Sequence, residues 1–258
     1  MEIKFAFAKT IIYEAAAYIR ERLDEPIVIA TKSGPTDLVT QLDEEVQDQL
    51  VQKILASYPE DKIFAEEKGL RHPIFDGQVW VIDPIDGTNN FIAQQTDFAI
   101  MLAYFENGVG QFGFIYDVMR DELYHGGGQF DVYCNEQKLA GYRDRSLQQS
   151  LISISAGFFQ SESIDILPLV HQSLGTRLYG SAGISFAKVL SGRLLLYVSS
   201  IFPWDYAAAS ILAEKLGYQV LTIDGQIPDF QTRQDVMIAP IEKMGEITSY
   251  IVKKEGVR

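Results

Sequence analysis

Residues 80–91 read Trp-Val-Ile-Asp-Pro-Ile-Asp-Gly-Thr-Asn-Asn-Phe and join a short apolar run to a polar turn. Two carboxylates, Asp83 and Asp86, follow the apolar run. Pro84 stiffens the backbone between them, and Gly87 lets a ligand approach the main chain closely. Taken alone, this pattern is more often a turn followed by a capped helix than a binding site.

The oxygens of this stretch suit a hard cation. Carboxylates, a backbone carbonyl and water are the ligands of Mg²⁺ in proteins, and the ion commonly also takes oxygens from a substrate phosphate. If residues 87–89 begin a short helix, its free N–H groups point to the same place and hold a phosphate. The stretch therefore predicts a joint site for a cation and a phosphate group.

Acidic residues at three other places could join this site. Glu66 and Glu67 end the preceding apolar run, and burying adjacent acids is unfavourable without cations or donors to balance them. A solvated surface pair is the simpler interpretation. Asp205 stands where the N-cap of an alanine-rich helix is expected, and capping alone would explain it. Asp43 has the same simple interpretation as a cap.

The remaining pattern predicts helices and strands in both halves of the chain. Apolar spacing predicts helices over 3–23 and from about Asp43 to Leu55, with Pro59 ending the second and turn residues 31–37 between them. Short apolar runs predict buried strands at 62–65 and 79–82, and an antiparallel meander over 98–138 with turns at 107–108, 120–121 and 126–128. Beyond it we expect strands at 151–155, 176–179, 194–198 and 237–239, and helices at 161–173, 184–190, 206–216 and from Ile241. This order predicts layers of helices and sheets with mixed strand pairing.

Composition narrows the function. The 258 residues include 22 Lys and Arg against 35 Asp and Glu, so the net charge is −13. That balance opposes binding to a nucleic-acid backbone, and a phosphorylated ligand would need a cation to bridge it. The single cysteine, Cys134, forms no intramolecular disulfide, which fits a reducing compartment. No secretory signal and no run of ~18 apolar residues is visible, so we expect a soluble, cytoplasmic protein with no membrane partner.

Taken jointly, these places resemble the inositol monophosphatase family of metal-dependent, lithium-sensitive phosphomonoesterases. The family's marks are a Glu-Glu pair, an Asp-Pro-Ile/Leu-Asp-Gly-Thr-x-Asn-Phe loop and a Trp-Asp-x-Ala-Ala-Gly helix start. Here the pair is 66–67, the loop is 83–91 and the helix start begins at Trp204. With residues 32–40 upstream, the resemblance spans nearly the whole chain. Ala209 departs from the family glycine, and we expect it to affect packing more than chemistry.

The resemblance implies a fold and a ligand set. The fold would be α+β, a layered αβαβα sandwich of the sugar-phosphatase type with mixed sheets. Residues 1–140 would form a half with the meander and the metal loop, and residues 141–258 a half that adds Asp205 and substrate contacts, both packed tightly as one unit. The metal ligands would be Glu66, Asp83, the Ile85 carbonyl, Asp86 and Asp205. They would hold roughly two or three Mg²⁺ ions, and lithium would inhibit.

The resemblance also implies roles in catalysis and binding. Thr88, with Asp43 as its partner, would orient and help deprotonate the attacking water, and Glu66 would act beside them. The amides of Gly87 and Thr88 would take phosphate oxygens, and Asp86 would lie among the substrate contacts. Gly180, Ser181 and Ala182 match the stretch that helps to hold the sugar or inositol ring. The predicted reaction is hydrolysis of a phosphate monoester without a covalent intermediate, in a homodimer whose partner is a small phosphorylated metabolite.

The sequence does not decide between several possible substrates. Inositol-specific members carry a glutamate several residues before the Trp-Asp pair, and residues 196–200 here read Leu-Tyr-Val-Ser-Ser with no acid. Fructose 1,6-bisphosphate, NADP and 3′-phosphoadenosine 5′-phosphate are therefore alternatives. From another class, a regulatory binding module would keep the fold, but it should have lost a ligand. A Ca²⁺-binding protein would be expected to show an Asp-x-Asp-x-Asp-Gly loop, which is absent.

Overall fold

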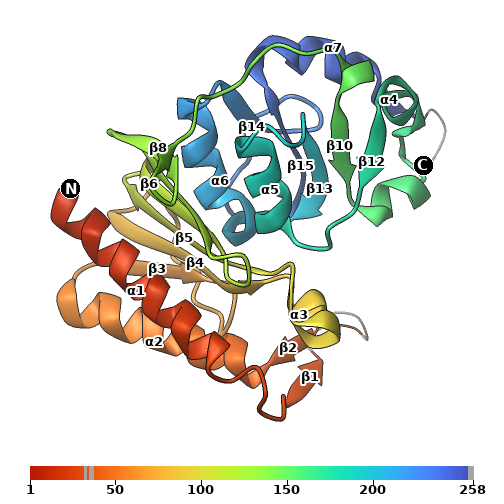
Figure 1. Cartoon of the computed structure of the whole chain (residues 1–258). Coiled ribbons are helices and arrows are strands. Elements are labelled where there is room, and N and C mark those ends of the chain that lie inside the picture. Colours follow the sequence, from red (N-terminus) through yellow and green to blue (C-terminus); the bar gives the residue numbers. More distant parts are fainter. Residues whose placement is uncertain (32–33, 35–37, 255–258) are drawn as a thin grey trace.

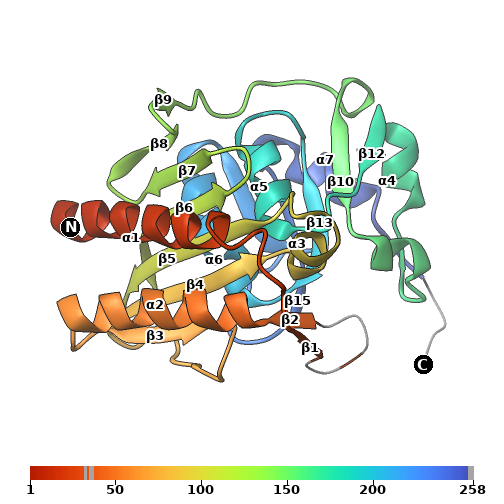
Figure 2. The ribbon, with the colours of Figure 1, turned by 60° about the horizontal axis from the view of Figure 1, so that its bottom comes forward.

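Five layers of helices and sheets make up the computed structural model, which describes residues 1–31, 34 and 38–254. Helices α1 (Glu2–Arg20) and α2 (Gln41–Ser57) cover the outer face of a seven-stranded sheet (Figures 1 and 2). Helices α5 (Ala182–Leu190) and α6 (Pro203–Lys215) lie between that sheet and a five-stranded one. Helices α4 (Leu167–Gln172) and α7 (Met244–Ser249) pack on the far side of the second sheet. The predicted αβαβα sandwich is confirmed.

The first sheet is the predicted meander with one parallel strand added. Its order is β3 (Lys62–Ala65), β4 (Gln78–Asp86), β5 (Ala99–Glu106), β6 (Val109–Asp117), β7 (Glu122–Gly127), β8 (Phe130–Cys134) and β9 (Gln137–Lys138). Strands β3 and β4 are parallel, and the remaining neighbours are antiparallel. In β4, Trp80 and Ile82 belong to the core against α1 and α2, while Val79 and Val81 belong to the core against α5 and α6. Helices on both faces explain why this strand is a continuous apolar run.

The second sheet has mixed pairing, as predicted. Its order is β12 (Gly175–Arg177), β10 (Leu151–Ile154), β13 (Tyr197–Ile201), β15 (Gln234–Pro240) and β14 (Tyr218–Thr222). Strand β10 pairs in parallel with β12 and β13, and β15 pairs antiparallel with β13 and β14.

Two short antiparallel pairs lie outside the two large sheets, β1 (Ile29–Thr31) with β2 (Leu38–Thr40) and β11 (Ile164–Asp165) with β16 (Val252–Lys253). Short helices complete the chain: α3 (Thr88–Gln94) and the 3₁₀ turns Leu147–Gln149, Ala156–Gln160 and Ile241–Lys243.

Several sequence predictions of local structure were wrong. The helix predicted over 161–173 is only α4, because Ile164 and Asp165 pair with β16 and Pro168 lies in the first turn of the helix. Strand β13 begins three residues later than predicted, and β14 was missed. Strand β11 depends on a partner that is distant in sequence, β16, which local patterns do not reveal, whereas the missed β14 pairs with the next strand, β15. Most of the predicted turn 31–37 lies outside the described residues. None of the described helices has the length and apolarity needed to cross a membrane.

Helix α6 lies unusually close to the first sheet. A Cβ atom placed on Gly113 of β6 would lie 2.5 Å from the backbone oxygen of Ala208. The facing residues Ala207, Ala208 and Ala209 are fully buried or nearly so. Small side chains on both elements therefore set the distance between helix and sheet, and Ala209 fits within this packing.

We expect Gly113→Ala to lower the melting temperature by about 3 to 10 °C, because the added methyl group forces α6 away from the sheet. Thermal unfolding followed by circular dichroism measures the change. Gly245→Ala is the matched control, since a Cβ atom there meets nothing within 4 Å. Equal effects of the two substitutions would show that the close packing of α6 does not limit stability.

Candidate functional site

The ends of two parallel strands bring the first acidic residues together. Glu66 directly follows β3, and Asp83 and Asp86 lie at the end of β4. Residues three apart in a regular strand point to opposite faces. The pairing of β4 with β5 shifts register between Asp83 and Asp86, where Pro84 has no N–H group to leave unpaired. The irregularity allows both carboxylates to reach one place.

Asp205 comes to the same place from the first turn of α6. One carboxylate oxygen from each of Asp83, Asp86 and Asp205 lies within 4.8 Å of the others. Asp83 and Asp86 are 1% and 7% exposed, and Asp205 is partly buried. The three residues form a compact acidic cluster with the chemistry of a divalent cation site.

The predicted caps Asp205 and Asp43 are not N-cap residues. The N-caps are Phe202 and Thr40, and each aspartate is the third helical residue after its cap. The Asp205 carboxylate accepts from the N–H of Phe202 at 2.8 Å, and the Asp43 carboxylate accepts from the N–H of Thr40 at 2.8 Å. Each side chain thus reaches back to the start of its helix with one oxygen. The other oxygen is available to the site.

Burial and mutual repulsion make the cluster unfavourable without positive charge. Burial, with repulsion from Glu66 next, raises the pKa of Asp83 well above its usual value. Burial also raises the pKa of Asp205 and raises that of Asp86 to about 6. The Oδ1 atom of Asp83 is buried and has no hydrogen-bond partner among the described groups. An unpartnered carboxylate oxygen among other carboxylates fits a bound cation.

Asp86 is held by the beginning of α5. Its carboxylate accepts from the hydroxyl of Ser181 and from the amides of Ala182 at 3.0 Å and Gly183 at 2.7 Å. A carboxylate at a helix N-terminus is stabilised by the free N–H groups and the helix dipole. Ser181 and Ala182, predicted as substrate contacts, therefore have a structural partner in Asp86. Gly183 was not among the predicted site residues, and its position directly after the predicted stretch was the available signal.

Thr88 belongs to the metal loop and contacts Asp43 of α2. Its hydroxyl is 3.0 Å from Oδ1 of Asp43 and 3.1 Å from the carbonyl oxygen of Ile85. Burial raises the pKa of Asp43 to about 6, although hydrogen bonds from Thr40 and Thr88 oppose that rise. The structure therefore brings Asp43, which is distant in sequence, into contact with Thr88. The carbonyl of Ile85, three residues before Thr88, lies at the same place.

Gly87 is required by a close contact across the site. It is the N-cap of α3 with a φ of 92°, which a side chain would strain, and a Cβ atom would lie 2.9 Å from that of Ser181. Gly180, in turn, faces the side chain of Asn90, whose amide donates to the Tyr179 carbonyl at 2.6 Å. Glycines on both sides thus let the metal loop and the start of α5 meet.

A cavity of about 560 Å³ lies beside the acidic cluster, and Asp205 is the cluster residue that lines it. The predicted residues Glu66, Gly87, Thr88 and Gly180 also line it. Further lining residues had no predicted role in the site, namely Ser200, Ile201, Phe202, Trp204 and Arg233. No motif pointed to Arg233, which is distant in sequence from the acidic residues. The cavity combines the predicted site with a wall that only the fold supplies.

Arg71 connects the two elements that carry Glu66 and Asp205, and no sequence motif pointed to it. Its guanidinium donates to the carbonyl oxygens of Ala65 and, at 2.9 Å, of Glu66. The same group lies 4.3 Å from the centre of a Trp204 ring. Arg71 therefore holds the end of β3 against the start of α6, the elements that carry Glu66 and Asp205.

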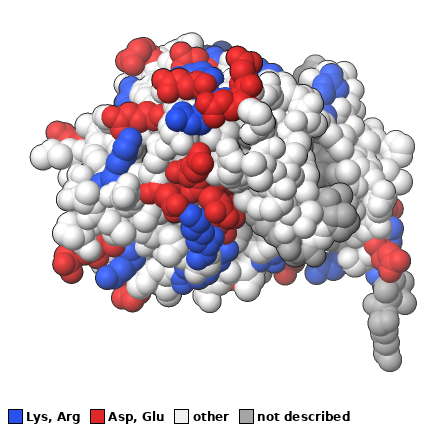
Figure 3. Space-filling view, turned by 90° about the horizontal axis from the view of Figure 1, so that it is seen from below, with Lys and Arg blue, Asp and Glu red and all other residues white. Residues whose placement is uncertain are grey.

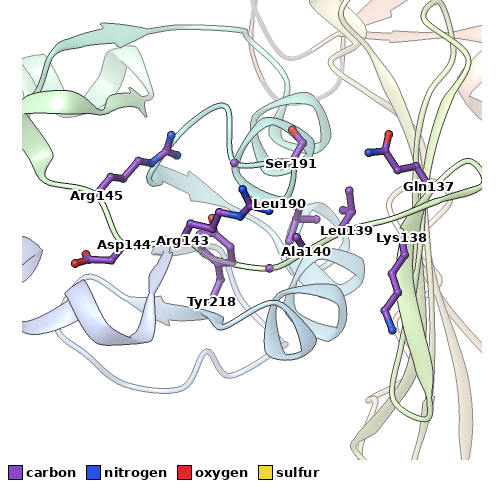
Figure 4. A pocket seen from close by; sticks show the side chains of 12 residues that line it. Gln137, Lys138, Leu139, Ala140, Arg143, Asp144, Arg145, Leu190, Ser191 and Tyr218 are labelled. Atoms are coloured by element: carbon purple, nitrogen blue, oxygen red, sulfur yellow. The ribbon is translucent and has the colours of Figure 1, made fainter.

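A separate cavity, of about 390 Å³, lies elsewhere. It is lined by the segment from Gln137 to Arg145, the end of α5 and Tyr218 (Figure 4). Its described lining contains none of the clustered carboxylates. The acid-lined cavity is therefore the candidate active site.

Removing one clustered charge should stabilise the metal-free protein. The pKa values of these carboxyl groups are higher in the folded protein than in the unfolded chain. The folded state therefore loses stability as the pH rises from their unfolded values through their folded ones, which is about 6 for Asp86. We expect Asp83→Asn to raise the melting temperature at pH 7.5, without divalent cations, by at least about 2 °C. Asp76→Asn, at an exposed site, is the control. A lower melting temperature for Asp83→Asn would contradict the repulsion described above.

Comparisons with known proteins agree with this geometry. The model of the inositol monophosphatase family matches residues 3–254. The inositol-1-monophosphatase of Bacillus subtilis (strain 168) is 40% identical over 236 residues, 89% of each chain. A solved structure of staphylococcal IMPase-I complexed with products has a TM-score of 0.88 and 26% identity, and the match covers 97% of this chain and 95% of that one. For an IMPase/NADP phosphatase complexed with NADP and Ca²⁺, the TM-score is 0.87 with 27% identity, and 95% and 93% are covered. This chain therefore belongs to the inositol monophosphatase family and is a phosphoric monoester hydrolase.

Proposed function

We propose that this enzyme hydrolyses small phosphate monoesters with Mg²⁺, by direct attack of water on phosphorus. The observation that carries the proposal is the convergence of Asp83, Asp86 and Asp205 within 4.8 Å, beside a cavity that Asp205 and Thr88 line. Glu66 and the carbonyl oxygen of Ile85 would complete the ligands of roughly two or three ions. When bound, such ions neutralise the phosphate, lower the pKa of water and stabilise the leaving oxygen.

The Thr88 and Asp43 pair would position the attacking water. The Thr88 hydroxyl donates to Asp43, which leaves its oxygen free to accept a hydrogen bond from water. As the water attacks, its proton would pass to Thr88 while the Thr88 proton passes to Asp43. A carboxylate whose pKa is about 6 is a suitable base near neutral pH. Glu66, which also lines the cavity, would act beside Thr88 and Asp43.

The phosphate and the rest of the substrate would lie between α3 and α5. The amides of Gly87 and Thr88 precede the first backbone hydrogen bonds of α3, so they have no carbonyl partner within that helix. They would take phosphate oxygens. Gly180, Ser181 and Ala182 face them from the start of α5 and would contact the substrate ring, with Asp86 fixed between the two segments.

The substrate range would be broader than inositol phosphate alone. The name of the Bacillus relative supports inositol 1-phosphate, and the structure with NADP supports a nucleotide. Residues 196–200 supply no acidic group for ring hydroxyls, and Val198 and Ser199 are buried in β13. A site without that acceptor discriminates less strongly. Fructose 1,6-bisphosphate, NADP and 3′-phosphoadenosine 5′-phosphate are therefore proposed beside inositol 1-phosphate.

The partner and the compartment of the enzyme are proposed from its charge and its cysteine content. Its partner would be a small phosphorylated metabolite rather than nucleic acid or a membrane, since the net charge is −13 and the Lys and Arg side chains on the face in Figure 3 are scattered among acidic ones. The single cysteine fits the cytoplasm. A homodimer and inhibition by lithium are proposed from the family resemblance. A purely regulatory role is disfavoured because the predicted metal ligands are all retained.

Phosphate release from four substrates tests the proposal directly. With Mg²⁺ we expect turnover of inositol 1-phosphate, fructose 1,6-bisphosphate, NADP and 3′-phosphoadenosine 5′-phosphate to differ by less than ~100-fold in kcat/KM. A chelator should abolish activity while circular dichroism shows an intact fold. Activity that survives chelation and dialysis would refute the role of Mg²⁺, and a preference for inositol 1-phosphate above ~100-fold would refute the broad range.

Thr88→Ala should affect catalysis more than binding. The substitution deletes the hydroxyl proposed to orient water but keeps the amide proposed to bind phosphate. We expect kcat to fall about 100-fold or more, with KM changed less than about threefold. Thr10→Ala is the control, since Thr10 is an exposed residue of α1. A KM effect larger than the kcat effect would assign Thr88 to binding instead.

A further inference from the structure

Arg233 lies where two cavities meet. It lines the active-site cavity together with Ser200, and both residues also line a second cavity of about 340 Å³. That second cavity is bordered by a set of small polar residues and one ring, namely Ser155, Gly157, Phe158, Ser161, Ser199 and Asp235. A group bound at Arg233 would therefore be within reach of a substrate whose phosphate lies over the acidic cluster.

The position of Arg233 is fixed by strand register. Strands β13 and β15 are antiparallel, with Ile201 opposite Gln234 at the end of the pairing. Arg233 immediately precedes β15, so it lies beside the turn that leads from β13 into α6. Its Nε and Nη2 atoms donate to the Ser200 carbonyl at 3.2 and 3.1 Å, and its guanidinium lies 5.6 Å from the centre of the Phe202 ring. The side chain is thus oriented before any ligand binds.

These contacts leave the charge of Arg233 available. Both hydrogen bonds go to one neutral carbonyl oxygen, and a guanidinium has five N–H donors. The two N–H groups of Nη1 and one of Nη2 remain for other acceptors. Arg233 is the only cationic side chain among the described residues that line the active-site cavity. A planar guanidinium with several donors matches the oxygens of a phosphate.

Asp235 decides on which side of Arg233 an anion would bind. Its carboxylate lines the second cavity, where it would repel a phosphate and accept hydrogen bonds from hydroxyl groups. The serines of that cavity suit hydroxyl groups as well. An anion therefore fits the active-site side of Arg233, and neutral polar parts of a larger substrate fit beyond it.

We propose that Arg233 is a specificity-determining residue that binds a second anionic group of the substrate. The favoured substrates would be phosphate monoesters that carry another phosphate or pyrophosphate, rather than esters of an uncharged polyol. This inference rests on the proposed function, because it assumes that the scissile phosphate lies over Asp83, Asp86 and Asp205.

A matched pair of nucleotides tests the inference. Adenosine 2′,5′-bisphosphate differs from 2′-AMP only by its second phosphate. We expect the wild type to favour the bisphosphate in kcat/KM, and Arg233→Gln to reduce that preference about 10- to 100-fold, mainly through KM. Arg233→Lys, which keeps the charge but not the planar donors, should lose less. Arg143→Gln is the control, since Arg143 is an exposed arginine lining the separate cavity in Figure 4.

Binding separates failure of this inference from failure of the proposed function. Titration calorimetry with Thr88→Ala and Thr88→Ala/Arg233→Gln should show Kd for adenosine 2′,5′-bisphosphate rising about 10- to 100-fold, and Kd for 2′-AMP rising at most about threefold. If the wild type released no phosphate from these two compounds or from the four substrates of the proposed function, that function would fail, yet the Kd values would still judge Arg233. Equal effects on both nucleotides, or no effect on either, would overturn the inference and leave Arg233 as a support for Ser200.

Discussion

The Asp86 carboxylate joins the first sheet of this enzyme to helix α5 at the candidate active site. Asp86 ends a strand of the first sheet, and its oxygens accept hydrogen bonds from Ser181, Ala182 and Gly183 at the start of α5. Those donors partly offset the cost of burying a charge next to other acids. The same contact sets the metal loop against the stretch proposed to hold the substrate. If Asp86 binds metal as proposed, it would couple the binding of metal to the binding of substrate through one side chain.

Small residues make this convergence possible. Gly113 lets α6 lie directly on the first sheet, and Gly87 and Gly180 let the metal loop and the start of α5 approach each other. Asp205, in the first turn of α6, reaches the acidic cluster because the helix lies so close to the sheet. The packing of α6 therefore links stability to chemistry. It holds the Asp205 carboxylate among other acids, which lowers the stability of the folded protein when no cation is bound.

Sequence motifs predicted the acidic cluster, whereas only the fold revealed the wall of the cavity. Arg71, Trp204, Phe202 and Arg233 form a line of guanidinium and aromatic groups, in which the rings of Phe202 and Trp204 stack with centres 4.7 Å apart. The acidic cluster would bind the reacting phosphate with its cations. In the proposed function, the wall would face the rest of the substrate. Relatives with the same cluster could thus differ in substrate through residues such as Arg233, without any change in the reaction.

The sequence by itself determined the layers and the reacting centre. Helical and strand patterns predicted α1, α2, the meander and the mixed second sheet, because each of these elements buries a continuous apolar face. The motifs at 66–67, 83–91 and 204–205 predicted the acidic cluster, because a cation site needs oxygens of these types. Only the tertiary structure decided which strands were added by distant partners, as with β11 and β16, and which oxygen of Asp43 or Asp205 faces the site. It also placed Arg233 on the cavity and Arg71 beside Trp204, since an exposed arginine carries no local signal, and its role arises from strand register and from what the fold brings beside it.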